Sequence, residues 1–195
     1  MSIRQMVEWG FFPSRKRARK RLSILVRRQQ VYLLGTARAI KRGRPEDVFA
    51  RWRAKADNLR HEVLFTDGLM PYLRAGLSVK RGRDVDQDFL PDGEMVFPTE
   101  FHNLAGFGEM DCGTMAYERI VRERFGKYRN CDVPVLWFEA SDIRLEGMRS
   151  RSQSVSHCSF FATLDAIKSD PFGPIWIDYF SRRHTLAEIG VQFAI

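Results

Sequence analysis

Short apolar stretches alternate with one long basic stretch over the first 44 residues. Residues 3–10, IRQMVEWG, predict a short helix, and Ser14 is placed to cap the helix that follows. Residues 15–28, RKRARKRLSILVRR, predict that second helix, with an apolar side and Arg or Lys at most other positions. QQVYLLG then predicts a strand. Helix, turn, basic helix and strand indicate an abbreviated winged helix-turn-helix over residues 1–44.

The pattern changes in residues 45–195, which we expect to form the core. Apolar residues recur at helical intervals over 45–75, which predicts one or two helices. LPDGEMVFP and EFHNLAGFGEMDCG predict two strands, and GTMAYERIVRERFGKYR an amphipathic helix. Residues 133–141, VPVLWFEAS, are almost continuously apolar, as in a strand buried on both faces. FFATLDAIKSD predicts a short helix and FGPIWIDYF a last strand. This order predicts an α/β fold with a mixed sheet flanked by helices.

Charge is divided unevenly along the chain. Residues 1–60 carry 17 Lys and Arg with 4 Asp and Glu, a net charge of +13, whereas the remaining 135 residues carry 15 and 20, a net of −5. A basic head of this kind is typical of binding to nucleic acid or to an anionic membrane surface. A merely solvated helical face is the alternative. The residues predicted to bind nucleic acid are Arg15, Lys16, Arg17, Arg19, Lys20, Arg21, Arg27 and Arg28.

Further features of the sequence concern membrane insertion, the cellular compartment and assembly. No stretch approaches 18 apolar residues, so we expect no insertion into a membrane, and the N-terminus lacks the features of a secretory signal. Cys112, Cys131 and Cys158 form no CxxC pair, which favours a reducing cytoplasm. The first helix of a winged helix-turn-helix would precede Met1. We therefore expect this unit to depend on the rest of the chain, or on a second copy in a homodimer, to fold.

Three acidic residues accompany the two predicted strands before the amphipathic helix. Asp92 stands at the entrance to the first strand, and Glu109 and Asp111 stand two residues apart on the second, so both leave the same face. If the strands pair, the three carboxylates converge and raise one another's pKa values. A divalent cation, Mg²⁺ or Mn²⁺, would relieve that conflict and activate water beside a phosphodiester. Alternatively, Asp92 only opens a turn and the other two lie on a solvated face.

These residues also resemble a known family. The pattern PDG, strand, E-x-D-x-G-T, basic helix ending in K-Y-R and buried strand VPVLWF resembles the plasmid replication-relaxation family. Proteins of that family are similar to MobC-type relaxases, with the restriction-endonuclease-like fold of the PD-(D/E)xK superfamily. RHEVLFTDGLMPYLRAG, RKRARKRLSILV and FFATLDAIKSDPFGPIW resemble its flanking segments, so the resemblance covers most of the chain.

The resemblance implies a restriction-endonuclease-like core over residues 45–195 that nicks double-stranded DNA in replication or mobilisation. Asp92 matches the motif aspartate, and Glu109 and Asp111 match the E-x-D pair, which makes these three the implied metal ligands. Asp111 stands where the superfamily has lysine, so a basic residue of the following helix is expected to replace it. Arg122, Arg124 and Lys127 are the candidates for that position, and Arg124 and Lys127 complete the expected catalytic set.

Two other functions fit parts of the sequence. A nuclease fold that has lost its lysine can persist as a catalytically inactive regulator of plasmid replication or transfer. An ADP-ribosyltransferase-like enzyme is a lesser alternative, because HEVLFTDGLMPYLRAGL followed by PVLWFEASDI loosely matches the order of elements in that fold. Such an enzyme would use NAD and would leave the grouping of acidic residues unexplained.

Overall fold

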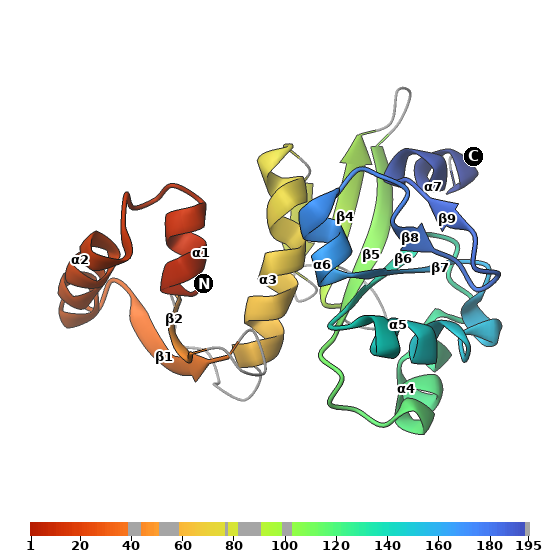
Figure 1. Cartoon of the computed structure of the whole chain (residues 1–195), viewed down its shortest axis with the longest axis horizontal. Coiled ribbons are helices and arrows are strands. Elements are labelled where there is room, and N and C mark those ends of the chain that lie inside the picture. Colours follow the sequence, from red (N-terminus) through yellow and green to blue (C-terminus); the bar gives the residue numbers. More distant parts are fainter. Residues whose placement is uncertain (39–43, 51–58, 77, 82–90, 99–102, 194–195) are drawn as a thin grey trace. The chain divides into compact units, whose positions relative to one another are not determined.

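The computed structural model describes residues 1–38, 44–50, 59–76, 78–81, 91–98 and 103–193, and the statements below concern these residues (Figure 1). The chain divides into two compact units, unit 1 (Met1–Asp67) and unit 2 (Gly68–Ile195), which we describe separately. The division expected after residue 44 lies inside unit 1, because a strand that begins at Glu46 pairs with the strand before it.

Unit 1 contains two short helices, an antiparallel hairpin and the first turns of a longer helix. Its elements are α1 (Ile3–Glu8), α2 (Arg15–Arg27), β1 (Tyr32–Ala37), β2 (Glu46–Ala50) and α3 (Leu59–Arg74), which continues into unit 2. The first two helices and the first strand confirm the sequence-based expectation. Residues 46–50 form a strand where a helix was expected, because pairing from Tyr32↔Ala50 to Ala37↔Glu46 satisfies their backbone groups. The rest of that expected helix before Leu59, residues 51–58, lies outside the described residues.

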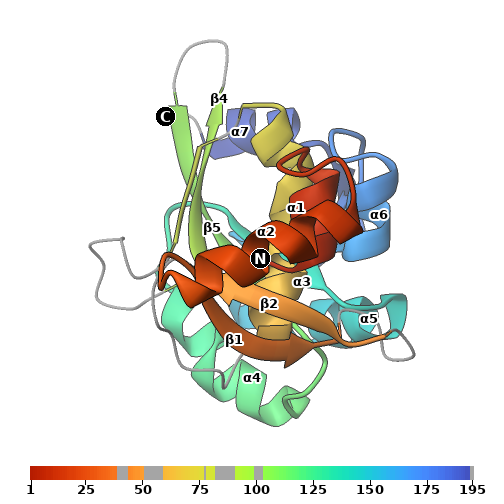
Figure 2. The same ribbon diagram turned by 90° about the vertical axis from the view of Figure 1, so that its left-hand side faces the viewer.

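The helices of unit 1 are fixed by caps and by one buried ion pair. The side chain of Ser14 caps α2 by accepting from the amide of Arg17 at 3.3 Å, as expected. Arg4 on α1 donates to Asp67 on α3 at 2.6 Å, and the side-chain amide nitrogen (Nε2) of Gln5 donates to the same carboxylate at 2.9 Å. Because Asp67 is buried, these bonds tie α1 firmly to α3. Figure 2 looks onto α2, with α1 beside it and the hairpin below.

Unit 2 is built on a mixed sheet of seven strands, so the coarse fold expected from sequence is confirmed. In spatial order the strands are β3 (Ser78–Arg81), β4 (Gly93–Pro98), β5 (Asn103–Asp111), β6 (Val135–Glu139), β7 (Ser159–Thr163), β8 (Trp176–Ile177) and β9 (Arg183–His184). The three central strands, β5 to β7, run parallel, and the outer pairs are antiparallel. All five residues of β6 are buried, as the apolar run predicted.

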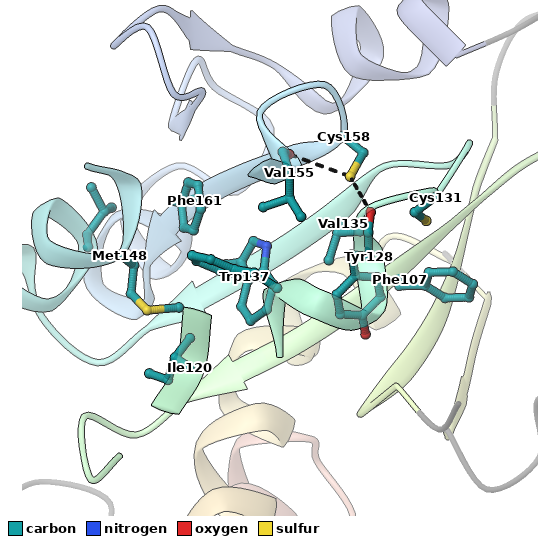
Figure 3. Packing of buried hydrophobic residues seen from close by; sticks show 12 residues of the cluster. Phe107, Ile120, Tyr128, Cys131, Val135, Trp137, Met148, Val155, Cys158 and Phe161 are labelled. Atoms are coloured by element: carbon teal, nitrogen blue, oxygen red, sulfur yellow. Dashed lines mark hydrogen bonds between the residues drawn. The ribbon is translucent and has the colours of Figure 1, made fainter. Parts of the chain in front are cut away.

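Helices cover both faces of this sheet. Besides the part of α3 from Gly68 onward, they are α4 (Tyr117–Glu123), the 3₁₀ turn η2 (Phe125–Tyr128), α5 (Asp142–Arg149), the 3₁₀ turn η3 (Gln153–Val155), α6 (Leu164–Ser169) and α7 (Leu186–Phe193). Trp137 of β6 points into a cluster with residues of α4, η2 and α5 (Figure 3). The next residue, Phe138, points to the opposite face, where it meets Gly68 of α3 and Trp176 of β8. The central strand is therefore covered on both sides.

Several segments of unit 2 differ from the expectation, among them α5 (Asp142–Arg149), where no element was expected. The segment FFATLDAIKSD was expected to be helical throughout, but Ser159–Thr163 form strand β7 and the helix begins only at Leu164. All five residues of β7 are buried between β6 and β8, so tertiary burial overrides the local helical pattern. Strand β3 lies in a charged stretch for which no element was expected, and it pairs with β4 at the edge of the sheet.

Close packing of α3 on the sheet gives a first prediction. A methyl group added at Gly68 would lie 2.6 Å from Cδ1 of Phe138 and 3.0 Å from Cδ2 of Leu164. Gly68→Ala should therefore destabilise unit 2 by about 1–3 kcal/mol, although alanine favours helix, and urea unfolding measures this loss. Gly126→Ala is the matched control, because no described atom lies within 4 Å of its added methyl. Equal stability of the two variants would contradict the packing.

Candidate functional site

Pairing of β4 with β5 brings the predicted acidic residues to one region of unit 2. Gly93 lies opposite Gly108, so Asp92 lies beside the end of β5, and its Oδ2 accepts from the amide of Met110 at 2.8 Å. Glu109 and Asp111 leave the same face of β5, as their spacing predicted, and both contact side chains from the helical layer on that face.

Glu109 lies at the centre of this region and is only 4% exposed. One carboxylate oxygen accepts from the guanidinium of Arg124 and the other from the hydroxyl of Tyr128. Burial raises the pKa of Glu109 to about 7, although Arg124 opposes the shift by favouring the charged form. Glu109 is therefore a carboxyl group that exchanges its proton near neutral pH.

Arg124, at the end of α4, bridges the acidic residues. Its Nη2 donates to Glu109 and also to Asp92 Oδ2 at 3.1 Å, and its Nη1 donates to the carbonyl of Met110 at 3.0 Å. Its guanidinium lies 5.3 Å from the centre of the Trp137 ring. Burial would lower the pKa of Arg124, but the carboxylates of Glu109 and Asp92 raise it above its ordinary value, so the guanidinium stays charged.

Asp111 is held by a different arginine. Arg144 of α5 donates to both carboxylate oxygens of Asp111, and its Nη2 also donates to the carbonyl of Met115 at 2.6 Å. The ring of Tyr117 lies 4.2 Å from the Arg144 guanidinium and holds its other side. Sequence reasoning missed Arg144, because it follows Asp111 by 33 residues and approaches only through the crossover after β6.

Glu139 is a second residue that the sequence reasoning missed. It ends β6, lies opposite Asp111 in the parallel register and is completely buried. Neither of its carboxylate oxygens has a hydrogen-bond partner among the described residues. Burial, and then the charge of Asp111, raise its pKa well above the ordinary value. A charged residue at the end of an otherwise apolar strand was the available signal.

The arrangement of these carboxylates does not fit a resident Mg²⁺ or Mn²⁺. Asp92 and Glu109 share one guanidinium, and both oxygens of Asp111 accept from another. Within the described ranges, no group of three or more His, Cys, Asp or Glu side chains is placed to hold a metal ion. The site is instead a network of buried carboxyl groups and guanidinium groups.

The remaining predicted residues lie outside this network. Lys127 is exposed on η2, and it makes no ion pair with Asp92, Glu109 or Asp111 in the described part of the chain. Arg122 pairs with Glu123 near the surface. The eight cations predicted to bind nucleic acid all belong to unit 1, and all are exposed: Arg15, Lys16, Arg17, Arg19, Lys20, Arg21, Arg27 and Arg28.

Comparison of the chain with protein-family models, curated proteins and solved structures gave no match. In the described residues, no helix combines the length and the apolar composition needed to cross a bilayer.

The buried position of Glu139 predicts how stability depends on pH. A carboxyl group whose pKa is raised by folding binds more protons in the folded than in the unfolded state above about pH 4.5, so stability falls as pH rises. Glu139→Gln should stabilise unit 2 at neutral pH and should flatten this fall. Part of the fall, from pH 4.5 to about 7, should remain because of Glu109.

Urea unfolding at a series of values between about pH 5 and pH 8 measures this effect. The matched control is Glu118→Gln, at an exposed position of α4, which should change stability by less than about 0.5 kcal/mol. An unchanged pH slope in Glu139→Gln would show that Glu139 is ionised in the folded protein.

Proposed function

We propose that this protein binds double-stranded DNA through unit 1. The observation that carries the proposal is the outer surface of α2, where the eight cations named above are exposed. Among the described residues, only Arg15 of this set forms an ion pair, with Glu46 at 3.5 Å. Seven cations are thus available to phosphates, which supply most of the affinity of a DNA-binding protein.

The architecture of unit 1 supports the same proposal. Helix α1, a turn and the basic helix α2 are followed by the hairpin β1–β2, the order of a winged helix-turn-helix with α2 as its recognition helix. Ser2 bridges to Val48, and Met1 and Phe49 exchange backbone hydrogen bonds of 2.9 Å, so the start of the chain joins the hairpin. Unit 1 also carries 17 Lys and Arg against 6 Asp and Glu, a net charge of +11.

We assign unit 2, with its mixed sheet, to a restriction-endonuclease-like core. The sequence resemblance to replication-relaxation proteins is the basis of this assignment and of our proposal that the protein belongs to a plasmid or other mobile element. Metal-dependent DNA nicking in replication or mobilisation is a second candidate function. The side-by-side position of Asp92 and Glu109 favours it, although a divalent ion there would have to displace Arg124.

A catalytically inactive regulator of plasmid replication or transfer is the competing form of the proposal. The pairing of Arg124 with Glu109 and of Arg144 with Asp111 favours it, because arginines already neutralise the carboxylates that a metal would need. DNA binding by unit 1 is common to both forms.

DNA binding of this kind depends steeply on salt. Affinity for a labelled duplex, measured by fluorescence anisotropy, should fall by about 10³-fold or more between roughly 50 and 200 mM salt if six or more phosphates are contacted. Lys20→Gln and Arg27→Gln should each weaken binding and reduce the salt slope by about 1. The matched control, Arg122→Gln, removes an exposed arginine of unit 2 and should leave affinity unchanged. A flat salt dependence would reject the proposal.

The second candidate function requires strand cleavage that depends on the acidic residues. Under this second candidate alone, the parent protein with Mg²⁺ or Mn²⁺ would convert supercoiled plasmid to nicked circles, and Asp111→Asn would abolish this conversion. Thermal unfolding of the variant shows whether loss of the charge that faces Arg144 has disrupted the fold. Equal nicking by both proteins would exclude Asp111 from the chemistry. No nicking by the parent would leave the inactive regulator.

A further inference from the structure

The turn between α1 and α2 carries two aromatic rings. Trp9 and Phe11 are stacked, with 5.9 Å between ring centroids and 14° between ring planes. Phe11 is nevertheless 60% exposed, which is unusual for so large an apolar side chain. Most of the surface of Phe11 is therefore open to solvent although the ring is stacked with Trp9.

Backbone geometry fixes the position of this pair. Gly10 has a φ of +80°, its amide donates to the carbonyl of Val7, and the amide of Phe11 donates to the carbonyl of Met6. These two bonds form the Schellman motif that ends α1. In that motif the residue at the position of Phe11 commonly packs back on the helix, but here it remains open to solvent. Three residues later, Ser14 caps α2, so the turn is held at both ends.

Cations follow this exposed ring closely in the sequence. The first turns of α2 follow directly and present Arg15, Lys16, Arg17, Arg19 and Lys20 to solvent. An exposed aromatic ring beside cations that contact phosphates is the combination that binds unpaired bases, since any base can stack on the ring. The bases of an intact duplex are stacked on one another and do not offer their faces. The positive charge of α2 therefore favours nucleic acid as the ligand of this surface, and the exposed ring favours an unpaired base as the part that it contacts.

We infer that the Trp9–Phe11 pair is a stacking platform for an unpaired base, so that unit 1 prefers duplex DNA that adjoins a single strand. The inference rests on the proposed binding of DNA by unit 1. It deepens that proposal by naming the form of DNA that is bound. Phe11 supplies the contact, and Trp9 holds the ring in place.

The test compares two labelled DNAs at one salt concentration: a blunt duplex, and the same duplex extended by a single-stranded overhang. The full-length protein should bind the overhang form about tenfold more tightly, the effect of one stacked base. Phe11→Ala should abolish this preference and leave affinity for the blunt duplex unchanged, whereas Phe11→Tyr should keep it. Phe180→Ala, which removes a 66% exposed aromatic ring of unit 2, is the matched control and should change neither affinity.

The outcomes of this test distinguish failure of the stacking platform from failure of the proposed duplex binding. Equal affinity of the parent protein for both DNAs, or an equal loss on both in Phe11→Ala, would overturn the stacking platform and leave duplex binding intact. Binding of the overhang form without the blunt duplex would reject the proposed function and keep the platform. Binding of neither DNA would overturn both. Thermal unfolding should show Phe11→Ala folded as the parent is, because the ring that it removes is largely exposed.

Discussion

The contact between Arg124 and Glu109 is the interaction on which the helical layer around the site depends. An isolated buried carboxylate is costly, and removal of one partner of a buried ion pair destabilises a protein by about 3–5 kcal/mol. Arg124, at the end of α4, is the positively charged partner of Glu109. It also binds Asp92, which immediately precedes β4. One guanidinium thus joins a helix to two strands. Tyr128 of η2 binds the other oxygen of Glu109, so the chain that follows α4 is fixed by the same carboxyl group.

The two arginines of the site nevertheless cannot balance the charge of all the acidic residues around them. Asp92, Glu109, Asp111 and Glu139 would carry four negative charges if all were ionised, against two positive charges from Arg124 and Arg144. Burial reduces this difference, because it raises the pKa of Glu109 to about 7 and that of Glu139 well above its ordinary value. The raised pKa values and the two arginines together lower the unbalanced negative charge that the sequence implies. This is why a cluster of acidic residues in the sequence need not indicate a metal site.

What could be predicted from the sequence depended on how local the determining interaction was. The same-face position of Glu109 and Asp111 follows from the repeat of a strand, and the cap of α2 follows from Ser14 alone. Strands β2 and β7 were assigned to helices, because their pairing partners decide their structure. The two arginines illustrate the same limit at the site. Arg124 lies 15 residues from Glu109, at the end of the next helix, and was a candidate. Arg144 lies on α5, in the connection between β6 and β7, and was not a candidate.

The distribution of charge between exposed and buried positions separates the roles of the two units. In unit 1 the cations of α2 are exposed and almost all unpaired among the described residues, so their field extends into solvent over about a Debye length. In unit 2, Glu109, Asp111 and Glu139 are buried and arginines pair with the first two, so these residues add little to the field outside the protein. Sequence counts alone make unit 2 acidic, with a net charge of −3, and would suggest repulsion of a polyanion. That count already includes Arg124 and Arg144 as positive charges, so their ion pairs leave it unchanged, and only the raised pKa values of Glu109 and Glu139 make unit 2 less negative than its composition implies.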